Sequence, residues 1–147
     1  MFISHSVNET EAFAASIAAT LHPGDVVALY GGMGAGKTAF VRGLARGLGY
    51  GGDVSSPTFA IINEYRGGRL PLFHFDMYRV TGWDDLESTN FYDYVEAGGV
   101  AAVEWSENIE AALPEGAIRV RMEKNGKIGK SERIIQINNR QNKPPTE

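Results

Sequence analysis

The feature that most constrains this chain is a glycine-rich segment, Gly31-Gly32-Met33-Gly34-Ala35-Gly36-Lys37-Thr38. It matches the pattern G-x-x-x-x-G-K-[ST], in which a strand leads into a glycine loop and a helix leaves it. Residues 25–30 form a short, mostly apolar run that is typical of a buried strand. After the loop, the apolar residues recur at helical spacing: Phe40, Val41, Leu44, Ala45 and Leu48. The sequence therefore predicts a strand, a phosphate-binding loop and a helix in succession.

The residue types in this loop suit a polyphosphate ligand. Glycines at 34 and 36 allow the backbone to approach the ligand, so that the amides of Gly34, Ala35, Gly36, Lys37 and Thr38 can point at phosphate oxygens. The helix that begins here adds the positive end of its dipole. We expect the Lys37 ammonium to contact the β- and γ-phosphates of ATP and the Thr38 hydroxyl to bind Mg²⁺. The alternative is an ordinary glycine-rich turn, against which the flanking strand and helix argue.

The composition indicates one globular domain. Hydrophobic residues at 43% and charged residues at 22% of 147 are ordinary for such a chain. We expect residues 1–138 to form a single domain and residues 139–147 to form a frayed tail. The net charge of −4 argues against a surface that binds nucleic acid by itself.

Cysteine content and hydropathy bear on the compartment. The chain has no cysteine, which excludes disulfides and cysteine-ligated zinc and fits a reducing environment. No apolar run reaches the roughly 18 residues of a membrane-spanning helix. The N-terminus lacks the basic and apolar regions of a secretory signal. We therefore expect a cytoplasmic protein that does not engage a membrane.

The remaining elements alternate between helices and strands. Asn8 and Glu11 have the spacing of a capping box at the start of a helix. The dipeptide Gly67-Gly68 is a two-residue hairpin signal between strands expected over residues 60–65 and 70–78. The elements expected after these are short helices over 83–87 and 91–96, a buried parallel strand over 100–105, a short helix over 106–113, and a hairpin of 117–123 with 133–137 turning at Asn125-Gly126. The predicted fold class is α/β, a P-loop NTPase-type three-layer fold with a mostly parallel central sheet and antiparallel hairpin additions.

Such a site needs an acidic residue near its metal, commonly at the carboxyl end of a neighbouring strand. Two acids qualify, because Asp76 follows apolar residues 72–75 and Glu104 follows apolar residues 100–103. We favour Glu104 as the magnesium ligand, since its strand has the pattern of a central parallel strand, whereas Asp76 lies in a hairpin. Either acid could instead face water at the end of a strand.

Three other residues are candidates for the site. Thr58, in Ser56-Pro57-Thr58-Phe59, follows the loop helix, and its hydroxyl could bind Mg²⁺ or orient a water, or it could be a plain turn residue. Thr10 could touch the nucleotide base or serve only in the first turn of a helix. Trp105 could pack in the core or lie beside the nucleotide.

Two charged or titratable residues have simpler explanations. His74 alternates with apolar neighbours and is expected to be buried and hydrogen-bonded. Arg79 could supply charge to a transferring phosphoryl group, but pairing with a surface acid is the preferred interpretation.

Four motifs together resemble the TsaE family (older name YjeE), bacterial ATPases required for making threonylcarbamoyladenosine in tRNA. The matching segments are Gly31 to Thr38, Ser56-Pro57-Thr58-Phe59, His74-Phe75-Asp76-Met77-Tyr78-Arg79 and Glu104-Trp105-Ser106-Glu107, in the order and spacing of the family. The resemblance covers residues 4–137 and is far more specific than the glycine loop alone.

The resemblance implies a P-loop α/β fold with weak intrinsic ATPase activity and with ATP and Mg²⁺ as ligands. It implies Mg²⁺ held by Thr38 and Glu104, with Asp76 essential nearby and Thr58, like Lys37, in a catalytic role. Trp105 would lie at the nucleotide and Thr10 near its base. The partners it implies are TsaD and TsaB, where TsaD transfers threonylcarbamoyl to a tRNA adenosine, so that tRNA is contacted only indirectly.

The chain departs from the family pattern at two places. Gly32-Met33 replaces the usual Asp-Leu in the loop, with little expected effect because the backbone does the binding, and Ser106 replaces the usual Pro after Glu-Trp. The family also places a basic residue of the last hairpin near the nucleotide. Both Lys130 and Arg133 qualify, and we include Arg133 among the residues expected to bind the nucleotide.

The hypothesis from sequence is therefore an Mg²⁺-dependent ATPase of TsaE type, in which Asp76 positions or polarises the attacking water. A small kinase is a rival, although no Arg-dense lid segment is present. A GTPase switch is another, but the guanine-reading string N-K-x-D is absent. The last rival is a non-catalytic module that binds nucleotide and docks a partner.

Overall fold

The computed structural model describes residues 1–57, 61–124 and 132–138. In this part of the chain seven strands form one sheet, in the order β1-β7-β6-β2-β5-β4-β3. The strands are β1 Phe2–Ser4, β2 Val26–Tyr30, β3 Ile62–Tyr65, β4 Leu72–Asp76, β5 Val100–Glu104, β6 Ile118–Lys124 and β7 Arg133–Asn138. The helices are α1 Val7–Ala18, α2 Lys37–Gly47, α3 Trp83–Ser88, α4 Phe91–Glu96 and the 3₁₀ helix η1 Ser106–Ala112.

The centre of the sheet is parallel and its two edges are antiparallel. Strands β4, β5, β2 and β6 lie in this order in the sheet and pair in parallel with one another. Strand β3 pairs antiparallel with β4 on one side, and β7 pairs antiparallel with β6 and β1 on the other. The prediction of an α/β fold with a mostly parallel central sheet and hairpin additions is confirmed.

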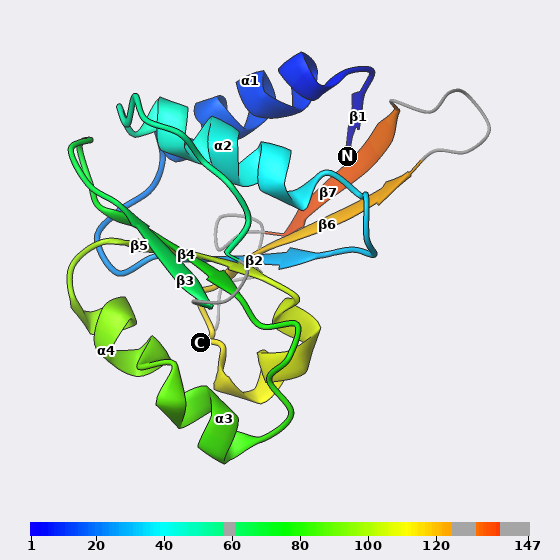
Figure 1. Cartoon of the computed structure of the whole chain (residues 1–147). Coiled ribbons are helices and arrows are strands. Elements are labelled where there is room, and N and C mark those ends of the chain that lie inside the picture. Colours follow the sequence, from blue (N-terminus) through cyan, green and yellow to red (C-terminus); the bar gives the residue numbers. More distant parts are fainter. Residues whose placement is uncertain (58–60, 125–131, 139–147) are drawn as a thin grey trace, which may run out of the picture.

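Helices cover both faces of the sheet, which gives three layers (Figure 1). Helices α1 and α2 lie on one face, and α3, α4 and η1 lie on the other. Strand β5 shows why, because its residues alternate between the two cores: Val100 and Ala102 pack toward α1 and α2, whereas Ala101 and Val103 pack toward α3 and α4. A strand that is buried on both sides has the near-continuous apolar pattern seen in the sequence.

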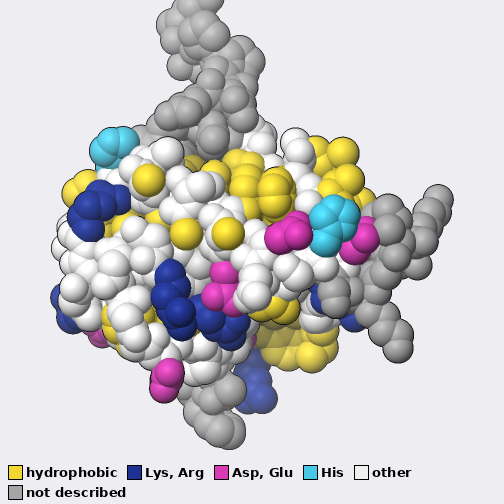
Figure 2. All heavy atoms as spheres, turned by 90° about the horizontal axis from the view of Figure 1, so that it is seen from above, with side chains coloured by type: hydrophobic (Ala, Val, Ile, Leu, Met, Phe, Trp, Pro, Cys, Tyr) yellow, Lys and Arg dark blue, Asp and Glu magenta, His cyan; other side chains and the backbone are white. Residues whose placement is uncertain are grey.

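The outer face of the α1–α2 layer carries mixed charges (Figure 2). Acidic side chains lie beside the basic ones near the centre of this view, and Arg42 of α2 is 3.3 Å from the Glu11 carboxylate of α1. Opposite charges at this distance partly neutralise each other. None of the helices in residues 1–57, 61–124 and 132–138 is long and apolar enough to cross a membrane.

Several local predictions were wrong. Helix α1 is capped by Ser6, not Asn8: the Glu9 amide donates to Ser6 Oγ at 3.1 Å, and the His5 amide donates to Glu9 Oε1 at 3.0 Å. Ser6 and Glu9 have the spacing of a capping box, although the Glu9 carboxylate accepts from the amide before the N-cap rather than from that of Ser6. The N-cap lies two residues earlier than predicted. Strand β1 was not predicted, because three residues show no periodicity.

The first hairpin has a longer connection than its glycine pair suggested. Tyr65 pairs with Leu72, so residues 66–71 form the loop rather than two residues. The segment after β5 is a 3₁₀ helix rather than an ordinary short helix. The turn expected at Asn125-Gly126 and the tail over residues 139–147 lie outside the described residues.

Candidate functional site

The glycine loop joins the end of β2 to the start of α2, as predicted. Gly34 and Gly36 have φ values of 77° and 100°, in the left-handed region where glycine is favoured. Gly36 occupies the N-cap of α2, so the first amides of that helix are left for a ligand. The dipole of α2 adds positive charge at the same point, and the geometry therefore suits an anion.

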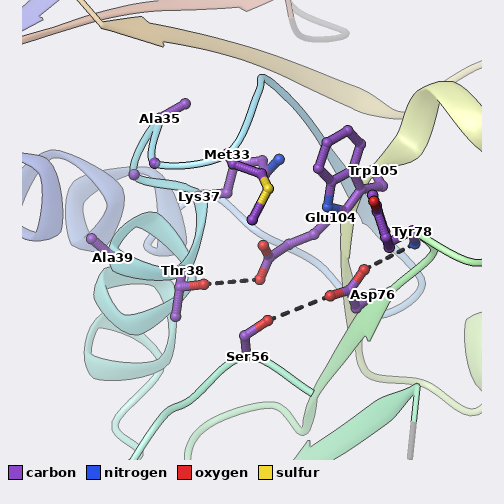
Figure 3. A pocket seen from close by; sticks show the side chains of 12 residues that line it. Met33, Ala35, Lys37, Thr38, Ala39, Ser56, Asp76, Tyr78, Glu104 and Trp105 are labelled. Atoms are coloured by element: carbon purple, nitrogen blue, oxygen red, sulfur yellow. Dashed lines mark hydrogen bonds between the residues drawn. The ribbon is translucent and has the colours of Figure 1, made fainter. Parts of the chain in front are cut away.

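A cavity of about 460 Å³ opens at this helix end (Figure 3). Its lining residues are Met33, Gly34, Ala35, Gly36, Lys37, Thr38, Ala39, Ser56, Asp76, Tyr78, Glu104 and Trp105. The structure thus brings together the predicted loop residues, both predicted acids and the predicted tryptophan.

The two acids lie side by side at the carboxyl ends of adjacent parallel strands. Asp76 and Glu104 are register partners on β4 and β5. The Thr38 hydroxyl donates to Glu104 Oε2 at 3.2 Å. The two predicted magnesium ligands therefore touch each other, although they are 66 residues apart in the sequence.

Asp76, at the cavity wall, accepts two hydrogen bonds, and one of them is long. Its Oδ1 accepts a hydrogen bond from the Tyr78 amide at 2.9 Å, and the Ser56 hydroxyl donates to Oδ2 at 3.5 Å. Figure 3 shows the side chains of Ser56 and Asp76 pointing toward each other. The sequence did not distinguish Ser56 from the rest of its motif, because its contact with Asp76 depends on the fold.

Lys37 is buried and folds back over the loop. Its ammonium donates to the Gly31 carbonyl and lies 3.9 Å from the centroid of the Trp105 ring. Burial lowers the pKa of Lys37, and the carboxylates of Glu104, Glu107 and Asp76 partly offset this effect. A cation that is partly stripped of water is a strong partner for phosphate oxygens.

Trp105 lies between the strand end and the cavity. Its backbone is in the left-handed region, with φ at 60°, which turns the chain directly after Glu104. The ring packs against Tyr78 with 5.0 Å between centroids. Ser106, which replaces the family's usual proline, is buried and donates to the Val103 carbonyl at 2.7 Å. The hydroxyl therefore stabilises the turn that a proline would stiffen.

The residues present fit Mg²⁺ in its usual nucleotide setting. Thr38 offers a hydroxyl and Glu104 a carboxylate, both hard oxygen ligands. Within the described ranges, no group of three or more His, Asp or Glu side chains has the geometry of a metal site. A Mg²⁺ ion that accompanies a nucleotide takes one or two protein oxygens and completes its coordination with phosphate oxygens and water.

Two basic side chains of the C-terminal hairpin reach the glycine loop. A carbon placed on Gly36 would lie 3.8 Å from Arg133 Nε, and one placed on Gly34 would lie 3.1 Å from Lys124 Nζ. Arg133 was a candidate, and the structure places it at the loop. Lys124 was missed, because nothing in its strand pattern distinguishes it from any solvent-facing lysine.

Four candidate residues are not placed in the cavity by the described structure. Thr10 is 2% exposed in α1, and its hydroxyl is 2.7 Å from Ser4 Oγ, away from the lining residues. Thr58 and Lys130 lie outside the described residues. Arg79 is exposed on the loop after β4. The roles of Thr10 and Thr58 stay predictions.

His74 behaves as expected for a buried, hydrogen-bonded histidine. It is fully buried on β4, with Nε2 at 2.5 Å from Glu104 Oε2 and Nδ1 at 3.1 Å from the Tyr65 hydroxyl. That it contacts the predicted magnesium ligand could not be read from the sequence, because the contact depends on the register of β4 against β5.

Comparison with known proteins identifies the family. The model of the family described as "Threonylcarbamoyl adenosine biosynthesis protein TsaE" matches residues 4–135. A protein of Bacillus subtilis named "tRNA threonylcarbamoyladenosine biosynthesis protein TsaE" is 42% identical over 132 residues, which is 90% of this chain and 82% of the relative. One of the same name from Treponema pallidum is 37% identical over 118 residues, covering 80% and 87% of the two chains.

A solved structure supports the same assignment. The crystal structure of YdiB from Bacillus subtilis is 39% identical, with a TM-score of 0.70, and the match covers 91% of this chain and 80% of that one. With a family model matched over most of its length and a glycine loop, two strand-end acids and a tryptophan gathered around one cavity, this chain belongs to the TsaE family.

Proposed function

We propose that this chain is an Mg²⁺-dependent ATPase that takes part in threonylcarbamoyladenosine modification of tRNA. The observation that carries the proposal is the contact between Thr38 and Glu104 at the open N-terminus of α2, with Asp76 on the neighbouring strand. The tRNA pathway comes from the names of the relatives, which are tRNA threonylcarbamoyladenosine biosynthesis proteins.

Each residue has a distinct task in this proposal. The amides of residues 34–38 and the Lys37 ammonium bind the phosphates, for which Lys37 leaves the Gly31 carbonyl. Thr38 and Glu104 hold the cation, which, when bound, neutralises charge on the phosphates. Asp76 accepts a hydrogen bond from the attacking water and orients it toward the γ-phosphate.

We propose TsaD and TsaB as the partners, as the family resemblance implies, with low turnover by the isolated chain. The cavity wall near Asp76 depends on the Ser56 segment, whose contact with Asp76 is long at 3.5 Å. A partner that presses this segment inward would shorten the contact and fix the carboxylate.

Phosphate release from ATP tests the proposal. We expect release by the wild type with Mg²⁺, little in EDTA, and faster release when purified TsaD and TsaB are added. Glu104→Gln keeps a hydrogen-bonding side chain but removes the charge, and should reduce release with and without the partners.

The same assay separates the rivals. Phosphate that appears on an added nucleoside or sugar acceptor instead of in solution would favour a small kinase. ATP binding without turnover, even with TsaD and TsaB present, would favour a non-catalytic assembly module.

A further inference from the structure

His74 lies at the centre of a chain of contacts behind the cavity. Its Nε2 is 2.5 Å from Glu104 Oε2, and its Nδ1 is 3.1 Å from the Tyr65 hydroxyl. That hydroxyl is in turn 3.0 Å from the backbone oxygen of Ser55. The chain therefore crosses three neighbouring strands, from the end of β5 through β4 to β3, and ends on the segment that precedes β3.

These contacts restrict the carboxylate of Glu104 at one oxygen. Because an ionised carboxylate can only accept, Nε2 of His74 carries the hydrogen of their contact. Thr38 donates to the same Oε2 from α2. One donor on the sheet and one on the loop helix thus hold this carboxylate, which is otherwise 4% exposed.

The last contact of this series, at Ser55, lies beside the segment that contacts the second acid, Asp76. The Asn63 side chain also donates to the Ser55 oxygen, at 3.0 Å. The next residue, Ser56, contacts Asp76. Tyr65 therefore touches both the ring that contacts Glu104 and the segment that contacts Asp76.

A core histidine needs only satisfied hydrogen bonds, and an apolar side chain would fill the same space at less cost in desolvation. What an apolar side chain cannot do is donate to Glu104. His74 thus contacts Glu104, the residue whose orientation is most critical in the proposed site.

We propose that His74 is a positioning residue for the magnesium ligand Glu104, and that Tyr65 holds the His74 ring in place. This inference rests on the proposed function, because it concerns the cation that accompanies the nucleotide. Residues that hydrogen-bond to a metal ligand typically change metal affinity by about 10–100-fold when they are replaced.

The experiment compares nucleotide affinity with and without Mg²⁺. Calorimetric titration of ATP in Mg²⁺ and in EDTA yields, for each variant, the factor by which the cation tightens binding. We expect His74→Phe, which keeps a ring but has no donor, to lower this factor by about 10-fold or more while leaving the affinity in EDTA within about threefold of wild type.

Two further variants keep the test decisive if His74→Phe does not fold. His74→Gln places an amide donor near the position of Nε2 and should restore most of the factor. Tyr65→Phe removes one hydroxyl and keeps the ring, and should lower the factor by a few-fold. Tyr94→Phe is the matched control, because Tyr94 also contacts a glutamate, Glu64 at 3.0 Å, but lies outside the chain of contacts; it should leave the factor unchanged.

The outcomes separate this inference from the proposed function. If the wild type binds ATP equally well in Mg²⁺ and EDTA, the magnesium part of the proposed function fails. If the wild type shows the factor and both His74→Phe and Tyr65→Phe retain it, the positioning role is wrong. An equal loss of affinity in Mg²⁺ and in EDTA would mean that His74 supports only the fold, and would also overturn the inference.

Discussion

Asp76 and Glu104 end adjacent strands, yet their surroundings differ. Glu104 is buried and accepts from both His74 and Thr38. Asp76 is more open and is held by the Tyr78 amide and, at 3.5 Å, by Ser56. A tightly fixed carboxylate suits a cation of strict geometry, whereas a carboxylate at the open wall can reach a water. The two acids therefore have separate roles in the proposed reaction.

Asp76→Asn tests this separation. The amide keeps an oxygen that accepts from the Tyr78 amide, so the fold and ATP affinity should stay near those of wild type. Turnover should fall by about 100-fold or more, because the group that orients the water has lost its charge. Single-turnover phosphate release beside calorimetric ATP affinity provides the comparison. An equal loss of turnover and of ATP affinity would show that Asp76 acts in ATP binding.

At the scale of elements, the loop helix α2 is held in place by close packing against α1. A Cβ on Gly43 would lie 2.3 Å from the Glu11 carbonyl oxygen, and one on Gly47 would lie 2.6 Å from the Ala15 carbonyl oxygen. Only glycine at these positions allows the two helices to approach this closely. The position of the helix end that carries Lys37 depends on this contact.

Gly43→Ala should therefore destabilise the protein by about 1–3 kcal/mol, because the backbone of α1 must move, even though alanine is the better helix former by about 1 kcal/mol. Urea unfolding provides the measurement. Gly51→Ala is the control, since a Cβ there meets nothing within 4 Å. Stability equal to wild type in both variants would contradict the packing described.

The hydroxyl of Tyr30 on β2 donates a hydrogen bond to the Glu110 carboxylate on η1. The ionisation of Tyr30 therefore makes stability depend on pH. Burial and the hydrogen bond to the Glu110 carboxylate raise the pKa of Tyr30 to about 12 from 10.0. Between these values the unfolded chain has lost a proton that the folded chain retains, so the free energy of unfolding falls as pH rises from 10 toward 12.

Urea unfolding over this pH range checks the prediction. Tyr30→Phe should have a shallower fall than wild type and a lower stability at neutral pH, because it lacks the bond to Glu110. Tyr92→Phe, at an exposed tyrosine of α4, should leave the pH dependence unaltered. An identical slope for wild type and Tyr30→Phe would show that this tyrosine does not titrate as described.

At the scale of the molecule, the pattern of the chain was enough to predict the parallel centre, both hairpins and the meeting of Asp76 with Glu104. Each of these follows from apolar runs whose ends must lie at the same edge of a parallel sheet. Contacts that depend on register or on side-chain reach were not predictable. Lys124 over Gly34 and His74 against Glu104 are both of this kind.

Two similar local patterns explain the wrong N-cap of α1. Ser6 and Asn8 both have an acid three residues later, and only the folded chain shows that serine caps the helix. Thr10 lies in a first helical turn, where it bonds to Ser4 of a strand too short to have a sequence signature.

Calorimetric titration of Lys37→Ala with ATP is the sharpest test that the loop over residues 31–38 binds the phosphates of ATP. We expect wild type to bind Mg²⁺-ATP and Lys37→Ala to show no detectable binding while keeping the wild-type circular dichroism spectrum. Arg46→Ala, at the other end of α2, should bind normally. Normal ATP affinity in Lys37→Ala would mean that the nucleotide binds elsewhere.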